Sequence, residues 1–523
     1  MKFNRYQKTY LALYFISLII FLINLVFQGQ IIFTNSDLFG LILKMSPIFW
    51  MGYLFLLILI IFQLSNFNKI GQKFAYLTLI LLVIYLIWTP FVHEYLARYP
   101  DAWIHSYLAQ KMFETGKVVN RLMIYEEYPG TFLFYGFSFQ VFPPYLVMKF
   151  LPPILYILGV IAIYLLFKCF FDSKVSFLAS VLYLFFNWTV EENHLSPQFL
   201  IFNLYLVFML VLIKFFSSSK KDRIPYLVFL FLMIPVIVFS HPGTPVFLIL
   251  ILGSMLILCK RVRSLGFFSI FLFLVITFVT YSYYQSIHFE SYKTIISHFF
   301  DILQSGELSG TTQRLGTTIP SRKIFLASRI TITVFSFIIG LMGILFLRKK
   351  RYKTESSLFI GWIFSMLLFT VFVSIGLKGQ FYERLVLVSS LPLAAVGAYF
   401  LKEFKVSRIM ILIILLLLTP LYFIAKYGNE GFESVSLEKL NAECFSHNFY
   451  DNCDEKQEIV DTLFGYDLEA SYPLFLSVTR ENILSTSLYN SMSLQDVKAK
   501  LESIILDRRL DKIYSSDAAA AYR

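Results

Sequence analysis

The residue types best suited to catalysis lie in two acidic segments of the chain. The first is YPDAWIHSYLAQKMFETGKVV, in which Pro100 marks the start of an amphipathic helix and Gly116 its end. Asp101 falls in the first turn, where the helix dipole favours a carboxylate, and His105 follows one turn later on the same face. A carboxylate held there could orient or deprotonate an acceptor hydroxyl, or bind a metal ion. It could equally serve only as a helix cap.

The second acidic segment is FNWTVEENHLSPQF, which places Glu191, Glu192 and His194 in a short turn with no basic residue to pair with them. If this turn approaches Asp101, two carboxylates and an imidazole could divide acid and base roles. Asp101, Glu192 and His194 could also share a divalent metal ion, Mg²⁺ or Mn²⁺. The alternative is a solvated turn without chemistry.

A third group of residues could bind an anionic substrate. Lys378 and Arg384 are the only basic residues in the turn before an apolar run at 385–401, and Arg384 could form bidentate hydrogen bonds to a lipid phosphate. Ordinary snorkelling of a long side chain is the alternative. His105 and His241 complete the set of candidate substrate-binding residues.

These residues must be positioned by a membrane-embedded scaffold. The chain has 523 residues, of which 58% are hydrophobic and only 15% charged, and its mean hydropathy is +0.69. We predict an all-α polytopic membrane protein, because about thirteen apolar runs are long enough to cross roughly 30 Å of hydrocarbon. The predicted spans are 10–27, 47–64, 74–91, 147–167, 174–190, 199–213, 225–240, 243–258, 266–285, 330–347, 357–377, 385–401 and 409–425.

Charge predicts how the spans are oriented. Basic residues gather in alternate connections, at 2–8, 69–73, 168–174, 214–223, 260–263, 348–353 and 402–408. Because cytoplasmic loops carry the excess of Lys and Arg, we expect the N-terminus inside and the C-terminus outside. The apolar stretch 130–146 would break this alternation if it crossed, so we expect it to lie in or re-enter the outer interface. All seven histidines then map to the outer side.

The chain divides into three predicted parts. Residues 1–73 form two N-terminal transmembrane helices, 74–426 form a transmembrane core with outer loops at 92–146 and 286–329, and 427–523 form an extracytoplasmic domain of soluble composition. In this tail, DEKQEIVDTLFGY and SLQDVKAKLESIIL have helical periodicity, while YPLFLSV and DKIYSSD are typical of strands, which predicts a small mixed α/β unit. Cys444 and Cys453 could form a disulfide in an oxidising exterior, remain free, or bind zinc with His447.

Several function classes are disfavoured. The net charge of +12 comes mostly from residues that border apolar runs, so no nucleic-acid-binding face is implied. Away from their ends, the predicted spans lack Asp, Glu, Lys and Arg, which argues against an ion-coupled transporter or proton pump. Proline breaks such as Pro152-Pro153 could still open backbone sites in a carrier.

The order of these motifs resembles the GT-C superfamily of membrane glycosyltransferases, which includes oligosaccharyltransferase catalytic subunits, protein O-mannosyltransferases and aminoarabinose transferases. An aspartate opens an amphipathic helix (PDAWIHSYLAQKMFETG), a Tyr-Pro follows (EEYPGTF), and a helix pair ends in an acidic turn (FLASVLYLFFNWTVEENHLSPQ). The segment KGQFYERLVLVSSLPLAAV is similar to a late helix start in the mannosyl and aminoarabinose transferases. The resemblance covers roughly 74–400. The second turn departs from the family's paired acids, and the tail lacks a Trp-Trp-Asp-Tyr-Gly string.

The resemblance implies a transferase in the cell membrane that moves a sugar from a polyprenyl-phosphate donor to an acceptor on the extracytoplasmic face. It implies that Asp101 is the catalytic carboxylate of the first loop and that Glu191 or Glu192 is the second acidic site. A carrier or flippase for a lipid-linked saccharide would use the same groove without bond cleavage. A third alternative is an assembly protein whose tail is the working part.

Overall fold

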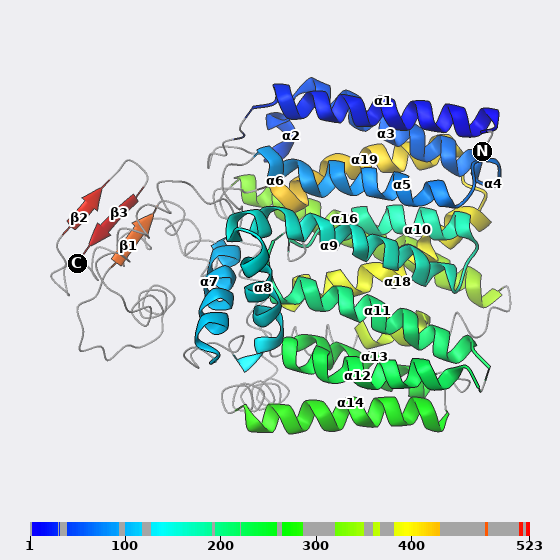
Figure 1. Ribbon diagram of the computed structural model, residues 1–523. Helices are drawn as coiled ribbons and strands as arrows, with labels where there is room; N and C mark the ends of the chain where they lie inside the picture. Colours follow the sequence, from blue (N-terminus) through cyan, green and yellow to red (C-terminus); the bar gives the residue numbers. More distant parts are fainter. Residues whose placement is uncertain are drawn as a thin grey trace.

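The computed structural model describes residues 3–29, 31, 39–93, 100–117, 127–190, 194–219, 221–258, 264–285, 320–349, 359–366, 381–428, 476–479, 512–515 and 519–522. Most of these residues form a bundle of helices whose axes run roughly parallel (Figure 1).

The described residues contain nine helices that are long and apolar enough to cross a membrane, which makes this a multi-pass membrane protein. They are α1 (Arg5–Phe27), α3 (Pro47–Ser65), α9 (Pro144–Lys168), α11 (Pro197–Ser217), α12 (Arg223–Ser240), α14 (Leu265–Tyr284), α16 (Pro320–Lys349), α18 (Phe381–Glu403) and α19 (Arg408–Tyr427).

Three shorter apolar helices also lie in the bundle. These are α5 (Lys73–Val83), which continues as the π-helical turn η1 (Ile84–Trp88), α10 (Ser173–Phe186) and α13 (Gly243–Leu258). All twelve helices fall on predicted spans. The span expected at 357–377 is described only over 359–366, which is helical, so the count of thirteen stays a prediction.

Local sequence explains where the helices begin. Asn4 forms a capping box with Gln7 at the start of α1, in which each side chain bonds the other's backbone N–H. Single side-chain caps begin five other helices of the bundle, at Ser46, Asp172, Ser196, Ser264 and Ser407.

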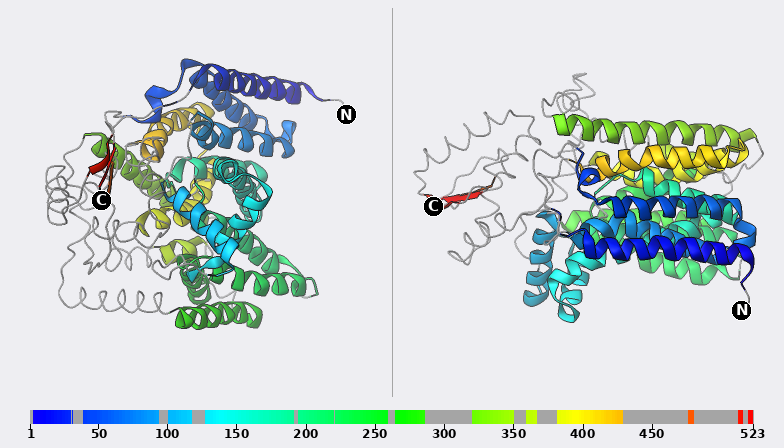
Figure 2. Two further views of the ribbon diagram at one scale, coloured as in Figure 1. Left: turned by 60° about the vertical axis from the view of Figure 1, so that its left-hand side comes forward. Right: turned by 90° about the horizontal axis from the view of Figure 1, so that it is seen from above.

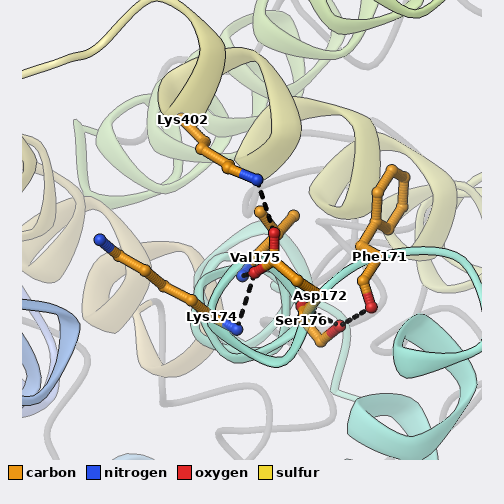
Figure 3. Close-up of polar contacts among 6 residues, drawn as sticks. All are labelled: Phe171, Asp172, Lys174, Val175, Ser176 and Lys402. Carbon is orange, nitrogen blue, oxygen red and sulfur yellow. Dashed lines mark hydrogen bonds and ion pairs between the residues drawn. The ribbon is translucent and has the colours of Figure 1, made fainter. Parts of the chain in front are cut away.

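Hydrogen bonds gather the segments predicted to be cytoplasmic at one end of the bundle. Asn4 donates to the carbonyl of Lys69 at 2.8 Å, and Lys168 donates to Gln72 Oε1 at 2.8 Å. Figure 3 shows a third link, from Lys402 to Asp172. The N-terminus marks this end in Figure 2. These basic connections lie at the same end of the bundle, which agrees with the predicted alternation of the spans. The assignment of that end to the cytoplasm rests on the charge rule.

Two helices lie across the opposite end of the bundle instead of along it: α7 (Pro100–Thr115) and α8 (Pro129–Val141) (Figures 1 and 2). At 13 residues, α8 is about 20 Å long, too short to cross the hydrocarbon core. This arrangement agrees with the expectation that 130–146 does not span the membrane. Three further short helices are α2 (Leu41–Lys44), α4 (Phe67–Ile70) and α6 (Thr89–His93).

A small antiparallel sheet lies beyond the end of the bundle that carries α7 and α8 (Figure 1). Its strands are β1 (Leu476–Thr479), β2 (Lys512–Ser515) and β3 (Ala519–Tyr522), in the order β1-β3-β2. In register, Leu476 and Lys512 both pair with Tyr522. β1 and β2 fall in the two segments for which strands were expected, and β3 was not anticipated. The expected tail helices lie outside the described residues, so the mixed α/β domain stays a prediction.

Candidate functional site

The structure describes the predicted site residues unequally. Asp101 is the second residue of α7 and Arg384 the fourth of α18, but their side chains lie outside what the structure describes. His105, His194 and His241 are described in full. The predicted residues that lie outside the described part are Glu191, Glu192, Lys378, Cys444 and Cys453.

The helix that carries Asp101 contacts the segment that directly follows the acidic pair in the chain. His105, one turn after Asp101 on α7, lies with its Nδ1 2.9 Å from the carbonyl oxygen of Leu195. The rings of His105 and His194 stack with 6.4 Å between centroids and 7° between planes. The structure therefore brings α7 next to the segment that follows the acidic pair. A site shared by the two acidic segments requires this approach.

Apolar packing reinforces this contact. Leu108, Ala109 and Met112 on α7 form one buried cluster with side chains of α8 and with Leu195. The hydroxyl of Tyr135 on α8 donates to the carbonyl of Ser196 at 2.7 Å. Because α7 is held on one side by α8 and on another by the 194–196 turn, the position of its first turn is fixed by tertiary contacts.

The two stacked histidines share a tautomer. Nδ1 of His105 faces the Leu195 carbonyl, and Nδ1 of His194 lies 3.2 Å from the carbonyl of Val190. A carbonyl oxygen only accepts, so each Nδ1 carries a proton, and in the neutral ring the lone pair then lies on Nε2. This is the form in which histidine binds a metal ion or accepts a proton.

His241 has a clear structural role at the start of α13. Its Nδ1 accepts hydrogen bonds from the backbone N–H groups of Gly243 and Thr244, both at 3.1 Å. The preceding carbonyl, of Ser240, accepts from Thr131 on α8 at 3.1 Å. His241 is fully buried and caps a helix next to α8, while its predicted part in substrate binding remains a proposal.

Two buried cations lie at the same end of the bundle and were not among the predicted site residues. Arg329 on α16 is 8% exposed and Lys426 on α19 is 0% exposed. The Arg329 guanidinium lies 4.3 Å over the ring of Trp188 and donates through Nε to the carbonyl of Ala425 at 2.9 Å. Lys426 Nζ lies 3.5 Å from the carbonyl of Asn187. Both cations therefore contact the segment that leads directly into the acidic turn.

Nothing in the sequence distinguishes these two cations from the Lys and Arg residues that commonly flank membrane spans. Each stands within one residue of a predicted span, where Lys and Arg commonly snorkel to the interface. The neighbouring aromatic residue was the available clue, since Trp188 lies beside the acidic pair in the sequence and arginine stacks well on indole.

Within the described residues, no group of three or more His, Cys, Asp or Glu side chains could hold a metal ion. Two of the three predicted ligands, Asp101 and Glu192, have side chains outside that part of the chain. The chemistry of the set nevertheless fits a divalent ion, because two carboxylates and an Nε2 lone pair are suitable donors for Mn²⁺.

Comparison with known proteins finds no matching family model and no matching curated protein. Among solved structures, the fold is similar to the crystal structure of the Archaeoglobus fulgidus oligosaccharyltransferase in complex with Zn and sulfate. The TM-score is 0.46 and the identity 15%, over 76% of this chain and 59% of that one.

A second structure is the archaeal oligosaccharyltransferase AglB from Archaeoglobus fulgidus with an inhibitory peptide and a dolichol-phosphate. Its TM-score is 0.45 at 13% identity, over 78% of this chain and 61% of that one. The chain thus spans about three fifths of the length of the structures it matches. Similarity at this level does not assign a function, and the proposal below rests on the residues of this chain.

Proposed function

We propose that the protein is a membrane glycosyltransferase that moves a sugar from a polyprenyl-phosphate donor to an acceptor on the extracytoplasmic face. The observation that carries the proposal is the contact of His105 with Leu195, which joins the helix of Asp101 to the turn of Glu191 and Glu192. Reacting groups must converge before their acidities matter, and this contact supports such convergence.

The chemistry assigns distinct roles to the two acidic segments. Asp101 accepts the proton of the acceptor nucleophile as that nucleophile forms a bond to the anomeric carbon of the donor sugar. The bond from that carbon to the phosphate oxygen breaks, and the polyprenyl phosphate leaves. Glu191 or Glu192 provides the second acidic group. His105 orients α7 through its hydrogen bond to Leu195.

The leaving phosphate requires positive charge in a site that excludes water. We assign this task to Arg384 and Lys378 and, in addition, to Arg329 and Lys426. The last two are buried beside Trp188 and Asn187, where a cation interacts more strongly with an anion than it would in water. The donor's apolar tail stays in the bilayer against the lipid-facing sides of the helices.

A divalent metal ion is compatible with this arrangement. Asp101, Glu192 and His194 would hold it, and such an ion would neutralise charge on the phosphate. His194 suits this role because its Nδ1 proton is held by the Val190 carbonyl, which leaves Nε2 as the ligating atom. Binding of Mn²⁺ by the protein without donor, followed by electron paramagnetic resonance, tests this assignment in the wild type and in His194→Ala.

The experiment that tests the function uses the purified protein in lipid nanodiscs with polyprenyl-phosphate-linked sugars that carry a radiolabel in the sugar. We expect the label to leave the lipid, either to an acceptor from a membrane extract or to water. Asp101→Asn should lower this rate by about 10²- to 10⁴-fold while the protein folds normally. Asp172→Asn is the matched control, since it makes the same change at the other end of the bundle.

Two outcomes would contradict the proposal. One is that Asp101→Asn cleaves the donor as fast as the wild type. The other is that the wild type, in proteoliposomes, moves the intact lipid-linked sugar between leaflets without cleaving it, which would assign it as a flippase.

A further inference from the structure

His93 is a buried histidine at the end of α6, just before the first outer loop. It is 5% exposed, and it contacts the end of α1 and the residues just after it, which the proposed chemistry does not use. Its Nδ1 lies 3.2 Å from the carbonyl of Gly29, and its Nε2 lies 3.2 Å from Asn24 Nδ2. Asn24 Oδ1 in turn accepts from the hydroxyl of Ser46 at 2.6 Å.

This cluster admits a consistent set of protons only when His93 is neutral. The Gly29 carbonyl can only accept, so the Nδ1 of His93 must donate to it. Asn24 uses Oδ1 to accept from Ser46, so its amide donates and Nε2 of His93 accepts. The tautomer follows from the network and not from observed hydrogens.

A second proton on His93 would break the network. The new Nε2–H would face the amide hydrogens of Asn24. Turning the Asn24 amide would bring its oxygen to the imidazolium, but the hydroxyl of Ser46 would then lose its acceptor. A buried donor without an acceptor costs more than an ordinary hydrogen bond contributes.

The cluster ties the N-terminal helices to the base of the first outer loop. The backbone N–H of Ile31 donates to the carbonyl of His93 at 2.9 Å. Gln28 accepts from the N–H of Ser46 at 2.6 Å and donates to the carbonyl of Lys44 at 2.7 Å. The end of α1, the start of α3 and the end of α6 are thereby joined, and α7 begins at Pro100, after residues 94–99.

The surrounding charges favour the neutral form. Burial lowers the pKa of His93 below its ordinary 6.5, and Lys149 on α9 lowers it further, although the hydrogen bond to Gly29 opposes them. Because the pKa is depressed in the folded protein, the stability that the cluster adds is complete above pH 6.5. It decreases as the pH falls below that value.

We propose that His93 is a positioning residue, which in its neutral form holds the end of α6, at the base of the first outer loop, to the end of α1 and the start of α3, and which on protonation loosens this junction. This gives helices α1 and α3, which no catalytic role requires, a function in the fold.

Hydrogen exchange at the junction tests the proposal without any substrate. Peptides covering 24–31 and 89–93 are compared at pH 8 and pH 5.5, after correction for intrinsic exchange rates. We expect at least threefold faster exchange at the lower pH in the wild type. Asn24→Asp should abolish this increase, because a carboxylate accepts both from protonated His93 and from Ser46. His93→Gln should give exchange that does not depend on pH in this range.

Asn4→Asp is the matched control, because it makes the same change at the other end of α1, where aspartate also caps the helix. It should respond to pH as the wild type does. If Asn24→Asp and His93→Gln both keep the wild-type response, another group titrates and the proposal is wrong. A failure of Asp101→Asn to affect sugar transfer would instead overturn the proposed function, whatever the exchange result.

Discussion

The imidazole rings of His105 and His194 lie almost parallel, with 7° between their planes and 6.4 Å between their centroids. One ring belongs to α7, the helix within the first outer loop, and the other to the segment after α10, 89 positions later in the chain. Both rings donate through Nδ1 to carbonyl oxygens at the 190–195 turn. The bond of His105 crosses from one acidic segment to the other, while the bond of His194 lies within the second segment and holds its ring in place for the stack.

Removing the His105 donor should loosen this contact. His105→Ala leaves the carbonyl of Leu195 without its hydrogen bond, and we expect a loss of about 1–3 kcal/mol in the free energy of unfolding. His105→Asn keeps an N–H near the position of Nδ1 and should lose less than half of that amount. Thermal unfolding in detergent measures the difference, and sugar transfer should fall in the same order. Equal stability of the Ala variant and the wild type would show that the contact does not hold α7.

The packing of α7 on α8 depends on a glycine. A Cβ on Gly136 would lie 2.7 Å from the carbonyl oxygen of Ala109 and 2.7 Å from Cβ of Phe113, so the two helices would have to separate. Gly136→Ala should therefore destabilise the protein by about 1–3 kcal/mol.

Gly253→Ala is the matched control, because its Cβ would meet only Phe271 at 3.5 Å, an ordinary contact. Because alanine favours the helical backbone more than glycine does, Gly253→Ala should leave the free energy of unfolding unchanged or raise it by up to about 1 kcal/mol. Chemical unfolding of both variants in the same detergent gives the comparison. Similar effects of the two substitutions would mean that close approach of α7 and α8 is not required.

The predicted sidedness can be measured by labelling. In a variant whose four cysteines are replaced by serine, Asp101→Cys and Glu192→Cys should both react with an impermeant maleimide added to intact cells. Lys69→Cys and Lys402→Cys should react only after the membrane is opened, because they lie at the end of the bundle where basic segments gather. Labels that place residues 101 and 192 on opposite sides would contradict both the topology and the proposed site.

Much of the scaffold could be predicted because hydrophobic length decides where a chain crosses a membrane. Each of the twelve described bundle helices falls on a run identified by its apolar residues. The exclusion of 130–146 from the spans followed from charge alternation and agrees with the way α8 lies across the bundle (Figure 1). By contrast, the π-helical turn at Ile84–Trp88 changes backbone geometry inside an apolar run, where hydrophobic length alone does not indicate it.

The site was less accessible to sequence analysis for a physical reason. The segments that carry Asp101 and the acidic pair were found because carboxylates beside apolar runs are conspicuous. Arg329 and Lys426 were missed because burial of a cation is a tertiary property. Arg329 is covered by Trp188 and Phe325, its guanidinium lying 4.3 and 3.9 Å over the two rings. Likewise, the role of His93 depends on Asn24, 69 positions away.

The ion pair of Asp172 and Lys402 joins the start of α10 to the end of α18 at the basic end of the bundle (Figure 3). The other end of α10 leads to the acidic turn, and the other end of α18 carries Arg384. Asp172 Oδ1 also accepts from the backbone N–H groups of Lys174 and Val175, both at 3.0 Å, and so caps α10. The two roles can be separated by substitution. Asparagine caps as well as aspartate, so Asp172→Asn removes only the ion pair.

Because the two side chains are 50% and 44% exposed, we expect Asp172→Asn to cost no more than about 1 kcal/mol. Asp172→Ala loses the cap as well and should cost about 0.5–2 kcal/mol more. Lys402→Met should match Asp172→Asn, and combining the two should cost no more than either alone. A combined loss equal to the sum of the single losses would show that the side chains do not interact.

The pH dependence of the Asp172 variant follows from its environment. Partial burial alone would raise the pKa of Asp172, but hydrogen bonds from Lys402 and the α10 backbone outweigh it and hold the pKa below the ordinary 3.8. A carboxyl with a depressed pKa stabilises the fold above its unfolded pKa, and this contribution is lost as the pH falls through the folded value. The stability difference between wild type and Asp172→Asn should thus be constant from pH 8 to pH 5, start to shrink near the unfolded pKa of 3.8 and disappear only below the depressed pKa of the folded protein. Melting temperatures across that range measure it, and a difference that persists in acid would place its origin elsewhere than in the charge of Asp172.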